Sequence, residues 1–135
     1  MKHHDPPRPT EAELEILTVL WSLGPSTVRE VHEAVARRKP AQQYTTVLKL
    51  LQIMAEKALV ERDEKQRAHI YKSSRPREWT QRQLAGDLLH RAFGGSAHSL
   101  LVGALTAKKA SKQELAEIRK LLDEYEGTNR EGTNK

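Results

Sequence analysis

The stretch QQYTTVLKLLQIMAEKALV, residues 42–60, decides the fold because it predicts a helix with two different faces. Apolar side chains recur at helical spacing along one face, which can line a core. They are Val47, Leu50, Leu51 and Met54. The polar residues of the opposite face are Thr45, Lys49 and Gln52, with Tyr44 and Thr46 near the start. Adjacent threonines are poor helix formers, so this polar edge needs an explanation other than helix stability.

Two more helices are predicted before this stretch, and each has a defined start and end. Residues 10–13, TEAE, form a capping box that begins a helix, and Gly24-Pro25 stops it. Residues 27–30, TVRE, form a second capping box, and the basic residues 37–39 suit a helix C-terminus. The second helix and the residue 42–57 helix therefore form a helix–turn–helix pair.

A β-hairpin is predicted directly after this pair. Residues 59–62 and 68–72 can form short strands, the second favoured by Ile70 and Tyr71, and the polar residues 63–66 form a turn of hairpin size. The order helix, helix, helix, hairpin is that of a winged helix–turn–helix, which we assign to residues 10–75.

Three further helices, without strands, are predicted for residues 76–126. Pro76 marks the boundary, Gly94-Gly95 breaks the first helix, Ser96 caps the second, and a capping box at residues 111–114 begins the third. Short amphipathic helices need another surface for their apolar faces, and a second copy of the chain is the simplest source. The candidate dimerisation residues are Leu100, Leu101, Leu105, Leu115, Ile118, Leu122 and Tyr125, of which the last four have a/d spacing.

The expected fold is therefore mainly α with a small β-hairpin. It comprises a winged helix–turn–helix N-terminal domain and a C-terminal three-helix dimerisation domain. Residues 1–9 and the polar residues 127–135 have no apolar periodicity. We expect them to form a disordered arm and a disordered tail.

Composition excludes several classes of protein. The 135 residues include no cysteine, which excludes disulfides, thiolate metal sites and a cysteine nucleophile. No apolar run approaches the roughly 18 residues of a membrane span, and the N-terminus has no apolar segment typical of a secretory signal. We expect a soluble cytoplasmic protein that does not bind membranes.

Positive charge is concentrated around the residue 42–57 helix and the hairpin. Residues 37–75 carry 10 Lys and Arg against 4 Asp and Glu, whereas residues 1–36 carry 3 against 6. Clustered Lys and Arg are typical of polyanion binding, although from charge alone a solvated basic face is an equal alternative.

DNA binding explains the polar edge of the residue 42–57 helix. The first turns of a helix in the major groove contact base edges, and threonine offers both a hydroxyl and a methyl group. The candidate base-reading residues are Thr45, Thr46, Lys49 and Gln52. The candidate backbone contacts are Tyr44, Arg62, Lys65 and Arg67, with Thr46 also able to donate to a phosphate.

Four segments together resemble the BlaI/MecI penicillinase-repressor family, which includes the CopY repressors. They are PTEAELEILTVLWSLGPSTVREVHEAV, YTTVLKLLQIMAEKALVERDEKQRAHIY, FGGSAHSLLVGAL and ELAEIRKLLDE, within residues 9–126. The resemblance implies a homodimeric transcriptional repressor that binds a double-stranded DNA operator with two-fold symmetry. It suggests an inverted repeat of TACA and TGTA half-sites.

The resemblance also suggests two ways in which DNA binding is regulated. In the β-lactam branch, a sensor-protease system leads to cleavage in the C-terminal domain, at a position corresponding to Gly103 and Ala104. The Asn-Phe pair of well-known members is absent here, which argues against the same cleavage. The cysteine-rich tail of CopY proteins is also absent, which excludes a copper-thiolate switch.

Two other classes of function were weighed against DNA binding. An enzyme or metal sensor is disfavoured because no HExxH or carboxylate-bearing metal motif is present, and we expect no cofactor. The histidines are His3, His4, His32, His69, His90 and His98. A winged helix that binds only proteins remains the alternative, but an interaction surface should carry apolar anchors, whereas the edge with Thr45, Lys49 and Gln52 is polar.

Overall fold

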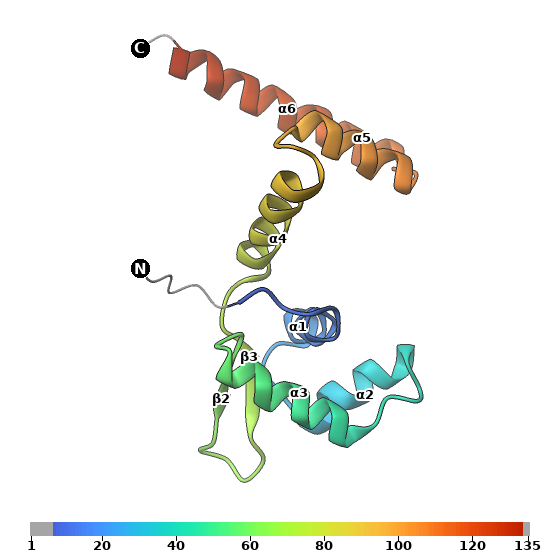
Figure 1. Cartoon of the computed structure of the whole chain (residues 1–135), viewed down its shortest axis with the longest axis vertical. Coiled ribbons are helices and arrows are strands. Elements are labelled where there is room, and N and C mark those ends of the chain that lie inside the picture. Colours follow the sequence, from blue (N-terminus) through green and yellow to red (C-terminus); the bar gives the residue numbers. More distant parts are fainter. Residues whose placement is uncertain (1–6, 134–135) are drawn as a thin grey trace. The chain divides into compact units, whose positions relative to one another are not determined.

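The computed structural model describes residues 7–133 and forms two compact units that divide between Gly86 and Asp87. The first unit contains helices α1 (Glu11–Leu23), α2 (Val28–Arg38) and α3 (Tyr44–Glu56) with a small sheet. Helix α4 (Arg77–Ala92) starts in the first unit and ends in the second, which also holds α5 (Ala97–Ala107) and α6 (Lys112–Thr133). Figure 1 shows this order of elements along the chain.

Reciprocal capping boxes begin both α1 and α2, as the sequence predicts. The Thr10 hydroxyl accepts a hydrogen bond from the Glu13 backbone N–H, and the Glu13 carboxylate accepts one from the Thr10 N–H. Thr27 and Glu30 form the same arrangement at α2. These contacts satisfy donors that a helix N-terminus would otherwise leave unpaired.

The sheet has three antiparallel strands in the order β1-β3-β2, formed by β1 (Ser26–Thr27), β2 (Val60–Asp63) and β3 (Ile70–Ser73). The predicted hairpin is confirmed, with each strand starting and ending slightly later than expected. The prediction of a hairpin alone missed β1, which pairs with β3 and extends it to a sheet. Between β2 and β3 runs a loop of residues 64–69, which with the two strands forms the wing.

The core of the first unit lies where α1, α2, α3 and the sheet meet. Its buried side chains are Ile16, Leu17, Leu20, Val28, Val31, Val35, Val47, Leu51, Met54, Leu59, Val60 and Tyr71. The predicted apolar face of α3 is therefore its buried face, with Leu50 only partly buried at its margin. This packing leaves the opposite face of α3 available for other contacts.

The first turns of α4 belong to the first unit, whereas we expected the boundary at Pro76. Thr80 is buried, and Trp79 lies under the Arg75 guanidinium, 4.4 Å from the ring centroid. A small hollow joins these turns to Leu59 and to residues 7–9 of the expected arm. Residues 1–6 of that arm lie outside the described residues.

The helices of the second unit end and begin where the sequence predicts helix breaks. Gly94 and Gly95 have φ angles of 57° and 82°, a left-handed region that favours glycine, and the Ser96 hydroxyl caps α5 by accepting from the Ser99 N–H. Helix α6 continues to Thr133, through residues for which we expected a disordered tail. The Thr128 hydroxyl donates to the Glu124 carbonyl in this stretch, as the helical backbone allows.

Candidate nucleic-acid interface

All the side chains proposed to contact bases are exposed on α3. Thr45, Thr46, Lys49 and Gln52 lie on its outer face, while Val47 and Leu51 on the inner face are fully buried. Helix α3 also starts without a side-chain cap at Gln43. Tertiary packing of the inner face therefore holds the helix in place despite its weak first turn.

The start of α3 is fixed by a histidine on α2. The His32 Nε2 atom lies 2.8 Å from the Gln42 carbonyl oxygen, to which it donates. The His32 ring also meets the Tyr44 ring edge to face, with centroids 5.8 Å apart. These contacts set the turn of the helix–turn–helix and orient Tyr44, whose side chain is 45% exposed.

A hollow of about 560 Å³ lies between α2, α3 and the wing, and we call it the basic groove. Its lining residues are Thr27, Val28, Arg29, Tyr44, Leu48, Gln52, Arg62, Arg67, Ala68, His69 and Tyr71. Four of them are predicted site residues: Tyr44, Gln52, Arg62 and Arg67. None of the described residues that line it is a carboxylate, so its electrostatic character favours an anion.

The other predicted contacts lie outside the basic groove. Thr45, Thr46 and Lys49 are exposed on α3 but do not line the groove. Lys65 lines a neighbouring hollow on the wing, together with Arg62, Lys72 and two carboxylates. The structure therefore separates a polar helix face, a basic groove and a wing tip of mixed charge.

Arg29 is a groove residue that sequence reasoning missed. It lies in the first turn of α2, just after the Thr27 cap, and its side chain is 83% exposed with Glu33 3.6 Å away. A cation is unfavourable near the positive end of a helix dipole. Its unusual position in a first turn was the available signal, because local rules tend to be broken where function requires it. His69 also lines the groove and was considered only as a metal ligand.

The charges of the wing are largely paired within the wing. Arg62 Nη2 lies 2.6 Å from Glu64 Oε2, Lys72 lies 3.7 Å from Glu61, and the Asp63 carboxylate accepts from the Lys65 N–H. The pKa of the Arg62 guanidinium is raised, first by its hydrogen bond with the Tyr71 side chain and then by Glu64. Arg67, by contrast, has no ion-pair partner among the described residues.

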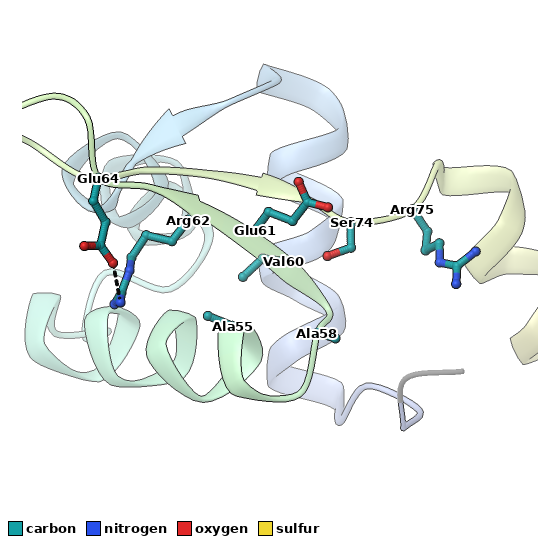
Figure 2. Close-up of a pocket in the computed structure, with 8 residues that line it drawn as sticks. All are labelled: Ala55, Ala58, Val60, Glu61, Arg62, Glu64, Ser74 and Arg75. Carbon is teal, nitrogen blue, oxygen red and sulfur yellow. Dashed lines mark ion pairs between the residues drawn. The ribbon is translucent and has the colours of Figure 1, made fainter. Parts of the chain in front are cut away.

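A second hollow beside the wing, of about 710 Å³, is drawn in Figure 2. The end of α3 and the start of β2 contribute Ala55, Ala58 and Val60, and the charged lining residues are Glu61, Glu64, Arg62 and Arg75. Because cations and carboxylates alternate here, this hollow does not offer a continuous cationic surface. The basic groove is the better candidate for a phosphate backbone.

The second unit exposes much of the apolar surface that we assigned to dimerisation. Tyr125, Leu122 and Leu105 are 62%, 54% and 37% exposed. Leu100, Leu101, Leu115 and Ile118 are partly buried. Val102 and Leu121 are also exposed, and they were missing from the predicted set. Large exposed apolar side chains clustered on two helices are typical of an interaction surface.

The predicted cleavage region lies inside regular helix. Gly103 and Ala104 are in the middle of α5, and a Cβ atom on Gly103 would meet the Phe93 ring at 3.4 Å. A protease requires an extended backbone, so this part of α5 would have to unfold before cleavage.

Neither a metal site nor a membrane span is found in the described part of the chain. Among residues 7–128, whose side chains the structure describes, no group of three or more His, Asp or Glu side chains could hold a metal ion. His3 and His4 lie outside the described residues. The helices of residues 7–133 are too short or too polar to cross a bilayer.

A helix–turn–helix with an attached wing, an exposed polar helix face and a basic groove defines a winged helix–turn–helix transcription regulator. The family model described as "Penicillinase repressor" matches residues 9–124. The chain is also 35% identical over 118 residues to proteins named Transcriptional regulator BlaI from two strains of Mycobacterium tuberculosis, covering 86% of this chain and 83% of each relative. The chain therefore belongs to the penicillinase repressor family, whose members are DNA-binding transcriptional repressors and not enzymes.

Proposed function

We propose that this chain is a homodimeric transcriptional repressor that binds an inverted-repeat DNA operator, with each α3 in a major groove. The observation that carries the proposal is the basic groove, which borders the exposed polar face of α3 and has no carboxylate among the described residues that line it. A major groove admits a helix, and the groove beside that helix suits the phosphate backbone that must run past it.

Base recognition is assigned to the exposed face of α3. Thr45 and Thr46 can touch a thymine methyl or hydrogen-bond to a base edge, Lys49 can donate to guanine, and Gln52 can pair with adenine. These side chains are all exposed on one face of α3, whereas the opposite face is buried in the core. Their common exposure supports the assignment.

Backbone binding is assigned to residues of α2, α3 and the wing. Tyr44, Arg29 and Arg67 line the basic groove, and Lys65 lies on the wing. Cations from two elements can neutralise phosphates beside a groove-bound helix, which fixes its register. Arg62 belongs to this set when it is free of Glu64.

Dimerisation is assigned to α5 and α6 of the second compact unit, and DNA binding to the first unit. The support for dimerisation is the exposed apolar surface around Leu105, Leu122 and Tyr125. Two linked half-site contacts gain affinity through effective concentration, so weakening the dimer would release the DNA. Cleavage at Gly103 and Ala104 is not part of the proposal, because α5 protects that bond.

The direct test is fluorescence anisotropy with a labelled duplex carrying an inverted repeat of TACA and TGTA half-sites. A scrambled duplex of the same composition serves as the control, at about 150 mM salt and across a salt series. Preference for the repeat with a steep salt dependence supports the proposal. Salt-dependent binding without preference rejects this operator, and an absence of binding even at low salt overturns DNA binding itself.

A further inference from the structure

Arg62 forms an ion pair with a carboxylate of its own wing. Its guanidinium lies 2.6 Å from the Glu64 carboxylate. Arg62 and Tyr71 are register partners on β2 and β3, so their side chains share a face of the sheet. Glu64 begins the loop that follows β2, two residues after Arg62. Figure 2 shows the resulting Arg62–Glu64 pair beside α3.

The same arginine borders surfaces of different charge. Arg62 lines the basic groove and also two hollows of mixed charge, whereas Glu64 lines one of the mixed hollows and not the basic groove. Phosphate in the basic groove and the Glu64 carboxylate therefore approach one guanidinium from different sides. Both ligands use the same kind of charge-assisted hydrogen bond, with planar N–H donors meeting anionic oxygens.

We propose that Glu64 is an intramolecular competitor of DNA phosphate for Arg62, so that the Arg62–Glu64 ion pair lowers the affinity of the wing for DNA. The inference rests on the proposed function, because it concerns how strongly the same interface binds a backbone. While its Nη2 contacts Glu64, Arg62 cannot present all of its N–H donors to a phosphate, and Glu64 repels any phosphate that comes close.

The Arg62–Glu64 ion pair lowers the affinity for all DNA and does not change the preference for one sequence over another. Phosphate contacts carry no sequence information directly, and each one adds about 0.9 to the slope of log affinity against log salt. An arginine held by its own carboxylate contributes less to this slope. Releasing Arg62 should therefore tighten binding to every duplex and make binding more sensitive to salt.

The test compares Glu64→Gln with the matched control Glu61→Gln in the full-length chain. Glu61 lies on β2 next to Arg62, and its side chain is 61% exposed against 55% for Glu64. It pairs with Lys72 at 3.7 Å rather than with Arg62. Each variant removes one negative charge from the wing, so the control measures the general electrostatic effect. Anisotropy with the operator and the scrambled duplex gives affinity across a salt series, and thermal unfolding checks that both variants fold.

Glu64→Gln is expected to tighten binding to both duplexes about three- to tenfold and to steepen the salt slope by up to about 0.9, with less than half of either effect in Glu61→Gln. In an Arg62→Ala background the difference between the two glutamate variants should disappear. Equal effects of the two variants, or a difference that survives in Arg62→Ala, overturn the inference while leaving DNA binding intact. If the unaltered chain binds neither duplex at low salt, the proposed function has failed instead.

Discussion

Lys57 donates to both carboxylate oxygens of Glu13, at 2.7 and 2.9 Å, across 44 positions of sequence. Glu13 is buried at the start of α1 and also completes the capping box by accepting from the Thr10 N–H. Lys57 directly follows the last residue of α3. One carboxylate therefore caps one helix and anchors the end of the proposed recognition helix.

Glu13→Gln is expected to destabilise the first unit at neutral pH by about 1–3 kcal/mol, the usual range for a hydrogen bond to a charged group. Glutamine can still complete the capping box, so the change isolates the lost charge beside Lys57. Urea unfolding measures the effect. The control is Glu15→Gln, which breaks a more exposed pair with Lys39 at 3.1 Å and should cost less than about 1 kcal/mol.

The Glu13 contribution should disappear in acid. Burial raises the pKa of this carboxyl, but the hydrogen bonds from Lys57 and Thr10 and the Lys57 charge outweigh burial and hold the pKa below its ordinary value of 4.5. A carboxyl with a lowered pKa in the folded state stabilises fully above its unfolded value, and that stabilisation is lost as pH falls through the folded value. The stability difference between the unaltered chain and Glu13→Gln should therefore be constant near neutrality and shrink below about pH 4.5. A difference that grows in acid would contradict this assignment.

Ala58→Gly is expected to stabilise the chain by up to about 1 kcal/mol. Ala58 follows α3 with a φ angle of 64°, in the left-handed region that costs a residue with a Cβ atom. The N–H groups of Leu59 and Ala58 bond to the Met54 and Ala55 carbonyls, a helix ending that favours glycine. The midpoint of urea unfolding should rise. Ala55→Gly, inside the helix, should lower it, and a fall in both would reject the strain argument.

Thr45→Ala is expected to reduce discrimination between the operator and a scrambled duplex by about 1 kcal/mol, roughly fivefold, because a base contact is lost. Affinity for the scrambled duplex should change little. Competition anisotropy measures the ratio, with Thr18→Ala on α1 as the control. An equal loss of affinity for both duplexes would make Thr45 a backbone contact.

Arg29→Ala is expected to weaken binding to all duplexes and to lower the salt slope by about 0.9, as the loss of one phosphate contact requires. The stability of the Arg29→Ala variant should stay constant or rise slightly, because a cation is removed from the start of α2. Arg67→Ala should have the same effect on binding. An unchanged salt slope in Arg29→Ala would remove α2 from the interface.

Leu122→Asp is expected to produce monomers, because it places a charge in the proposed apolar seam of α6. Light scattering after size exclusion at micromolar concentration measures the mass. Lys120→Asp is the control, since helical spacing puts residue 120 away from the seam. A dimer that survives Leu122→Asp would move the interface to other residues.

Features held together by neighbouring residues could be predicted from the sequence. Both capping boxes located the starts of α1 and α2 because their hydrogen bonds join residues three apart. The polar face of α3 followed from helical spacing alone.

Features that depend on distant parts of the chain could not be predicted in this way. Ser26 and Thr27 carry no strand pattern and become β1 only because β3 lies beside them. The capping box places Glu13 at the start of α1, but its ion pair with Lys57, from the end of α3, depends on tertiary packing. The position of Arg29 in the basic groove could not be predicted, because only the tertiary structure brings Arg29 to the same hollow as Arg67 and His69 of the wing.

The measurement that tests the central claim most directly is selection of bound duplexes from a random-sequence library by the full-length chain at near-physiological salt. Binding as a dimer through two copies of α3 predicts enrichment of an inverted repeat, with its half-sites separated by about one helical turn or a multiple of it. Selection with Thr45→Ala should enrich half-sites with a weaker sequence preference but with the same spacing. A pool that stays random, or that yields a single unrepeated site, would contradict the account of a sequence-specific dimeric repressor.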